Sequence, residues 1–225
     1  MNIKIQILAL MILLATGHGM DAAWMGRDDL LDDEIILDSC RVDFPDEFGN
    51  TPLENAMFFK NDIQKVKQLI ASGANVNTQN NWMQAPPLYN AIKNDQNKMI
   101  PLLLAAGADV NQQNRFGSTS LHAALYDFRP VNIIQLLVDA GADVNQQNNF
   151  GNTPLHIAAQ FNTGEAIQAL LAVGSEINKQ NDCGDTPLHL AYHLYSHSEI
   201  TQFLIAAGAD QTIRNNKGKT AAFID

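Results

Sequence analysis

The sequence is poor in the residues that build several common kinds of site. It has only two cysteines, Cys40 and Cys183, and they form no Cys-x-x-Cys motif of the zinc or redox type. Basic residues are few, because 14 Lys and Arg stand against 24 Asp and Glu, which gives a formal net charge of −10. A chain with this charge is a poor candidate for binding the phosphates of DNA or RNA.

Long apolar runs are also scarce. The run from Ile5 to Ala15 is too short for a comfortable membrane span, and no other segment is a candidate. Lys4 precedes this run and small residues follow it, so residues 1–19 are predicted to be a secretory signal peptide. We therefore expect export from the cytoplasm, to the medium or the periplasm. An uncleaved N-terminal membrane anchor is the alternative.

Motifs of catalysis are missing as well. The chain has no Gly-x-Ser-x-Gly sequence and no phosphate-binding loop. His193 and His197 have the i, i+4 spacing of a metalloprotease helix, but Leu194 stands where that motif requires Glu. We predict no catalytic residue, no metal, no cofactor and no small-molecule substrate, with an enzyme on a repeat scaffold as the weakest alternative.

The chain does have a two-part motif that recurs about every 34 residues. The first part occurs at residues 49–53, 117–122, 151–156 and 184–189, as in Gly151-Asn-Thr-Pro-Leu-His156. The second part occurs at residues 73–77, 107–111, 141–145, 174–178 and 208–210, as in Gly141-Ala-Asp-Val-Asn145. A fixed period of this length predicts a stacked array of small units rather than one globular core.

Each unit reads as two helices and a turn. A Thr that is usually followed by Pro is a strong signal for a helix start. The first helix then carries an Ala on one face, where a small side chain lets the neighbouring helix approach closely. A second apolar run follows with i, i+3, i+4 spacing, which predicts an amphipathic helix that ends at a left-handed Gly such as Gly141. An Asn such as Asn148 then marks the turn, because Asn tolerates left-handed and turn conformations well. Pro101 falls inside the second helix of the second unit, where it is expected to kink the helix or to be tolerated as drift.

These two motifs at this period resemble the ankyrin repeat. The resemblance implies an all-α ankyrin-repeat solenoid over residues 46–225, with about five full repeats and a truncated sixth. Their approximate bounds are 46–79, 80–113, 114–147, 148–180, 181–214 and 215–225. The sequence departs from the family pattern at Glu54 and Tyr89, which replace the usual His, and at residues 84–89, which lack the usual Gly and Thr.

The resemblance also implies a function. His122, His156 and His189 take the family's structural role of hydrogen bonding within the turn, and stacked repeats keep them too far apart to share one zinc ion. Ankyrin proteins bind other proteins through the turn tips and the concave face of the first helices, without catalysis. Aromatic residues recur at these tips, as in Phe48, Phe116 and Phe150. The partner-binding candidates are Trp82, Lys93, Arg115, Phe116, Tyr126, Asn149, Phe150, Gln160 and Asp182.

The partner is expected to be a protein of unknown identity and the chain a monomer. An envelope scaffold or inhibitor is the alternative to a secreted binding module. Residues 20–45 are acidic, and they are predicted to be either a helix that caps the first repeat or a flexible arm. Cys40 precedes the first repeat and Cys183 lies in the turn that opens the fifth, roughly 30–40 Å away, so we predict that both are free or at most form a disulfide between molecules.

Overall fold

The fold of the chain is given by a computed structural model. The structure describes residues 42–58, 62–79, 83–161, 164–195 and 199–223. The predicted signal peptide, most of the acidic segment, Cys40, Trp82 and His197 lie outside these residues.

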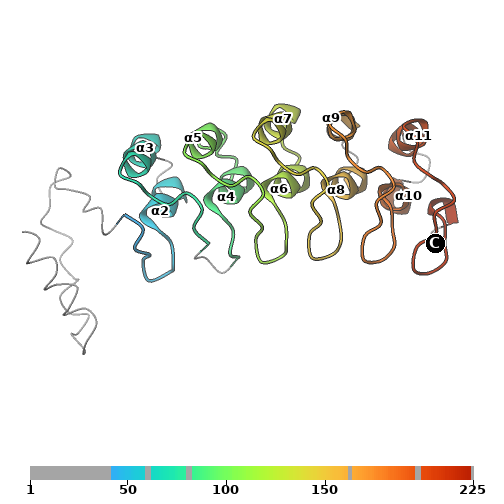
Figure 1. The fold of residues 1–225 in the computed structure, drawn as a ribbon, viewed down its shortest axis with the longest axis horizontal. Helices are drawn as coiled ribbons and strands as arrows, with labels where there is room; N and C mark the ends of the chain where they lie inside the picture. The colour runs from blue at the N-terminus through green and yellow to red at the C-terminus, as the bar shows by residue number, and fades with distance from the viewer. Residues whose placement is uncertain (1–41, 59–61, 80–82, 162–163, 196–198, 224–225) are drawn as a thin grey trace, which may run out of the picture. The chain divides into compact units, whose positions relative to one another are not determined.

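Ten α-helices and one short 3₁₀-helix make up the regular structure of the described part. They are α2 (Pro52–Phe58), α3 (Ile63–Ala71), α4 (Pro87–Lys93), α5 (Ile100–Ala105), α6 (Ser120–Tyr126), α7 (Val131–Asp139), α8 (Pro154–Gln160), α9 (Gly164–Ala172), α10 (Pro187–Tyr195), α11 (Glu199–Ala206) and η2 (Ala221–Phe223). Figure 1 shows them in two layers, with the even-numbered helices in one and the odd-numbered helices in the other. We call these the inner and the outer helices. This arrangement confirms the predicted all-α repeat fold.

The inner helices begin as the sequence predicts. Thr153 is the N-cap of α8, and its hydroxyl and the ring of His156 form a reciprocal capping box. Thr119 and His122 do the same at α6. The inner helices then pack closely through alanines that are buried in every repeat, because a methyl group allows neighbouring helices to approach. These alanines are Ala56, Ala91, Ala124, Ala158 and Ala191.

The outer helices coincide with the second apolar runs, with one correction. Helix α5 has six residues, whereas α3, α7 and α9 have nine. Pro101 lies in the first turn of α5, where a missing N–H group breaks no intrahelical hydrogen bond. Pro101 therefore shortens this helix from its start and does not kink its middle.

The described asparagines open the turns as the sequence predicts, but not with a left-handed backbone. None of the described turn asparagines is left-handed; in the described ranges, the non-glycine residues with positive φ are Gln84, Asp95 and Phe128. Asn148 instead accepts hydrogen bonds with its side-chain oxygen from the N–H groups of Phe150 and Asn152, at 3.0 and 3.1 Å. The left-handed positions fall on glycine as expected, for example Gly141 with φ +91° and Gly151 with φ +72°.

The repeat register continues upstream of the first predicted repeat. Val42 is buried, and the Oδ1 atom of Asp43 accepts a hydrogen bond from the Asn75 N–H at 2.8 Å. Asn77 makes the same contact with the N–H of Asp109, one repeat later. Val42 and Asp43 thus occupy the positions of Val76 and Asn77. None of the helices in the described ranges is both long enough and apolar enough to cross a membrane.

Candidate protein-binding surface

A hairpin-like turn precedes each inner helix, and we call these turns the hairpin row (residues 46–50, 83–84, 114–118, 148–152, 181–185 and 215–219). Each complete turn is closed by one carboxamide or carboxylate. Asn114 Oδ1 accepts from the N–H groups of Phe116 and Ser118, at 2.9 and 3.0 Å. Asp46 does the same in the first turn, and the hydrogen bonds that it accepts, above all from the Asn55 amide, lower its pKa.

Backbone hydrogen bonds join the described tips to one another from the second repeat onward. The N–H groups of Arg115, Asn149, Asp182 and Asn216 donate to the carbonyl oxygens of Met83, Phe116, Phe150 and Cys183, at 2.9 to 3.2 Å. The side chain of Asn149 adds a bond from Nδ2 to the Arg115 carbonyl at 3.1 Å. From Met83 to Asn216 the tips therefore form one continuous hydrogen-bonded series, in which Met83 holds the place that Phe116 and Phe150 hold in later repeats.

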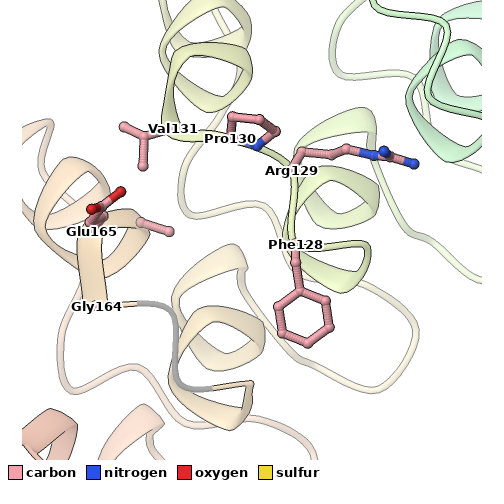
Figure 2. Close-up of a pocket in the computed structure, with 7 residues that line it drawn as sticks. Phe128, Arg129, Pro130, Val131, Gly164 and Glu165 are labelled. Atoms are coloured by element: carbon pink, nitrogen blue, oxygen red, sulfur yellow. The ribbon is translucent and has the colours of Figure 1, made fainter.

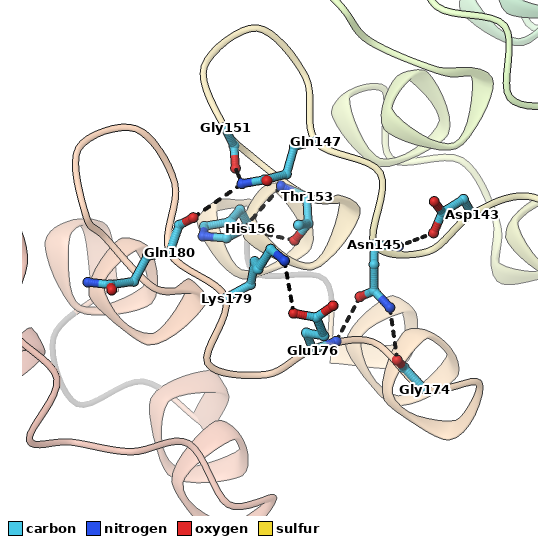
Figure 3. Close-up of polar contacts among 10 residues, drawn as sticks. All are labelled: Asp143, Asn145, Gln147, Gly151, Thr153, His156, Gly174, Glu176, Lys179 and Gln180. Carbon is cyan, nitrogen blue, oxygen red and sulfur yellow. Dashed lines mark hydrogen bonds and ion pairs between the residues drawn. The ribbon is translucent and has the colours of Figure 1, made fainter.

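A glutamine ladder runs beneath the tips, and sequence reasoning missed it. Gln147 Nε2 donates to the carbonyl of Gly151 in its own turn at 2.6 Å and to that of Gln180 in the next repeat at 3.2 Å (Figure 3). Gln113 and Gln180 make the equivalent pair of bonds. Glutamine at one position of successive repeats was the signal that could have identified the ladder.

A second ladder uses the asparagine that ends the second part of the motif. Asn145 Oδ1 accepts from the Glu176 N–H at 2.8 Å, while its Nδ2 donates to the Gly174 carbonyl at 3.1 Å (Figure 3). Asn77 and Asn111 repeat this bidentate contact. The ladder fixes the spacing between neighbouring repeats, since each carboxamide satisfies a donor and an acceptor of the next backbone.

The three motif histidines have the structural role that the resemblance implies. His156 Nδ1 accepts the Thr153 N–H at 3.1 Å, and Nε2 lies 3.0 Å from the Asp185 carbonyl of the next repeat. Both contacts are satisfied by the neutral ring with its proton on Nε2. Burial lowers the pKa of His122 and of His156 to about 4, because a charged ring would lose water and also its Nδ1 acceptor. Repeat one uses Glu54 instead, whose carboxylate accepts from the N–H and hydroxyl of Thr51.

Large apolar side chains project from the hydrogen-bonded turns of the hairpin row. Phe48, Phe116 and Phe150 are 74, 40 and 59% exposed. The Arg115 guanidinium lies 5.4 Å from the centre of the Phe116 ring. Soluble proteins expose large apolar side chains in a repeated row mainly where something binds. The predicted candidates Arg115, Phe116, Asn149, Phe150 and Asp182 all lie in this row.

The other described candidates lie elsewhere. Lys93, Tyr126 and Gln160 are the last residues of α4, α6 and α8, so they lie at the opposite end of the inner helices from the tips. Lys93 forms an ion pair with Asp127 at 2.9 Å. The Tyr126 ring packs edge-on against Phe161, and burial raises its pKa. The predicted site thus divides into two groups of residues.

Within the described ranges, no three His, Cys, Asp or Glu side chains are grouped as a metal ion would require. Cys183 is an exposed free thiol at its tip.

A family model described as ankyrin repeats in three copies matches residues 19–114, 53–148, 88–181 and 155–224, in overlapping ranges. The chain belongs to the ankyrin repeat family, whose repeats are generally protein-binding modules on a typically non-catalytic scaffold. A comparison with curated proteins gives no match.

Proposed function

We propose that this protein is a non-catalytic binding module that holds a partner protein against its hairpin row and the adjoining face of the inner helices. The observation that carries the proposal is the row of exposed phenylalanines on turns that are already fixed by hydrogen bonds. Aromatic side chains supply much of the energy of protein interfaces. A surface that is ordered before binding loses little conformational entropy when the partner arrives.

Specificity would come from the tip residues that differ between repeats. Arg115 and Asp182 occupy equivalent tip positions and carry opposite charges, while their backbone N–H groups make the same contact. Trp82, which lies outside the described residues, is retained as a candidate. The Asn149 carboxamide is already bonded to Arg115, so we assign it to holding the tips together.

Export from the cytoplasm is part of the proposal and rests on the N-terminal sequence alone. A secreted module would appear in the medium, whereas an envelope scaffold would remain with the cells. Cell fractionation with an antibody to the repeats separates these two locations. Finding the full-length chain in the cytoplasm would reject both.

The binding surface can be tested by affinity capture with a matched control. We would compare the wild type with a Phe116→Ser/Phe150→Ser variant and with Val173→Ser, which removes an exposed apolar side chain after the outer helix α9. We expect the double variant to lose the captured partner, with folding intact by circular dichroism, and Val173→Ser to retain it. Equal capture by all three proteins would remove the hairpin row from the binding surface.

A further inference from the structure

A second surface lies where the two helices of a repeat are joined. A hollow of about 280 Å³ opens between the inter-helix loop of repeat three and the start of α9 in repeat four. Its lining is Phe128, Arg129, Pro130, Val131, Gly164, Glu165 and Ala166 (Figure 2). Pro130, Val131 and Ala166 give it apolar walls, and Gly164 and Ala166 leave it open because they have little or no side chain.

Phe128, beside this hollow, has an unfavourable backbone for its residue type. Its φ is +53°, a left-handed conformation that is costly for a bulky side chain. Asp95 has the equivalent place after α4 with φ +58°, and Asp is a residue that tolerates this conformation. Phe128 is nevertheless 60% exposed. Strain combined with exposure of an aromatic ring is a reason to look for a function at this position.

Phe128 is part of a strip of three aromatic rings. The Phe161 ring contacts both of the others edge-to-face, with its centre 5.6 Å from that of Phe128 and 5.7 Å from that of Tyr126. The strip runs from the end of α6 across to the end of α8. Because Phe128 also lines the hollow, the strip adds aromatic surface next to the apolar walls.

The charge at the hollow is negative. Arg129 turns its guanidinium away, with Nη1 2.6 Å from Asp95 Oδ1 and Nη2 3.1 Å from the Lys93 carbonyl (Figure 2). Glu165 is exposed at the rim, and none of the ion pairs among the described residues involves it. A ligand in the hollow would meet apolar walls and one uncompensated carboxylate, on a chain with a formal net charge of −10.

We propose that the hollow and the Phe128 ring form a second docking site, distinct from the hairpin row. Its occupant is a segment of a partner protein that inserts an apolar side chain into the hollow and places a lysine or arginine against Glu165. The basic residue is favoured because its charge complements that of Glu165. The apolar residue is favoured because it can pack against the apolar walls and the exposed Phe128 ring.

An array of immobilised nonapeptides tests this chemistry with the full chain. The peptides have Leu or Phe at the centre and Arg, Ser or Glu at the flanking positions, in a Gly-Ser background. We expect the wild type to prefer an apolar centre flanked by Arg. Phe128→Asn should weaken that binding at least about tenfold, because Asn tolerates the left-handed backbone but lacks the ring. Glu165→Gln should weaken it about threefold and reduce its salt dependence.

The Phe116→Ser/Phe150→Ser variant separates this site from the hairpin row, since it should bind the peptides as the wild type does. Loss of binding in that variant would assign the peptides to the hairpin row and overturn the proposal. Absence of any preference for Arg over Glu, or equal binding by Phe128→Asn and the wild type, would also overturn it. If Phe128→Asn melts lower than the wild type, Glu165→Gln alone carries the test, because its side chain is exposed.

The identity of the occupant is tested by replacing Phe128 with photoreactive benzoyl-phenylalanine. Irradiation with an Arg-flanked peptide should give a cross-linked adduct, which a tenfold excess of unlabelled peptide suppresses. A cross-linked dimer of the chain in place of the adduct would make a second copy the occupant. A cross-link within one chain would make it a segment of the same molecule. Either of these two results would reject a partner protein as the occupant.

Discussion

The hairpin row and the inter-helix loops differ in how closely one repeat copies the next. Along the hairpin row and the ladders beneath it, the same glutamine, asparagine and glycine make the same contacts in successive repeats, at nearly the same distances. The loops share far less. One contains Asp95 and another Phe128 at the same left-handed position, and the ion pairs of Lys93 and Arg129 each occur once among the described residues. Repetition identifies the contacts that stack the repeats, and irregularity identifies the places where function can differ.

The two regions are expected to contribute differently to stability and to binding. The hairpin row and the glutamines, asparagines and histidines beneath it contain polar groups whose partners lie in the next repeat, so removing one leaves a desolvated donor or acceptor. The charges and rings of the loops are exposed or half-buried, so water reaches more of the groups that their loss leaves unpaired. Stability should therefore depend on the hairpin row, while changes in the loops should alter binding with little effect on folding.

Acidification should have the largest effect, and it should act on the histidines that join the starts of the inner helices to the hairpin row. The pKa of His122 and of His156 is about 4 in the folded protein, against an ordinary value of 6.5. Between these values the unfolded chain binds protons that the folded chain does not, so the free energy of unfolding falls as the pH decreases from about 6.5 to about 4. One pKa unit corresponds to about 1.4 kcal/mol, which gives a loss of a few kcal/mol per histidine.

Urea unfolding at several pH values between 7 and 4 measures this loss. The His122→Gln/His156→Gln variant is the control, because a glutamine at the third helical position can still reach back to the N-cap N–H. Its stability should be lower at pH 7 and should change less with pH. A wild type whose stability is constant over this range would contradict the assignment of these two rings as neutral and buried.

A pair of glycines gives the next largest effect. Both Gly151 and Gly141 have positive φ, but an added Cβ would lie 2.5 Å from the Asp182 nitrogen at Gly151 and would meet nothing within 4 Å at Gly141. Gly141→Ala should cost about 1 kcal/mol of stability, from backbone strain alone. Gly151→Ala should cost about 3 kcal/mol, because the next tip must move as well. If urea unfolding gave the same loss of stability for both variants, the contact between Gly151 and the next tip would not be tight.

The sequence predicts the local features well because they depend on nearby residues. The N-caps at Thr119 and Thr153, the left-handed glycines and the two helices per repeat all follow from short patterns. The cross-repeat partners of Gln147 and Asn145 could not be assigned, because they lie 29 to 33 residues away and depend on how the repeats stack. Phe128 was missed for a different reason: phenylalanine carries no sequence signal for a left-handed turn.

The glutamine ladder allows a matched test between neighbouring residues. Gln147 Nε2 bridges two repeats, whereas Gln146 Nε2 has one long contact, 3.4 Å to the Gln147 carbonyl. Gln147→Ala should cost about 2 kcal/mol, because two carbonyl groups lose their donor. Gln146→Ala should cost less than about 0.5 kcal/mol. Thermal or urea unfolding measures the loss of stability in each variant. A larger loss in Gln146→Ala than in Gln147→Ala would reject the bridging role of Gln147.

The smallest effect is expected from the ion pair between Arg129 and Asp95 in the inter-helix loops. Nη1 of Arg129 lies 2.6 Å from Asp95 Oδ1, but the Asp95 side chain is 63% exposed, so water and salt screen the attraction. A double-mutant cycle with Arg129→Ala and Asp95→Ala should give a coupling of about 0.5 kcal/mol, which falls further in 0.5 M salt. The cycle is needed because Arg129→Ala alone also removes the bond from Nη2 to the Lys93 carbonyl. A coupling above about 2 kcal/mol would mean that the loops stack the repeats as the hairpin row does, and the division of work between the two regions would not hold.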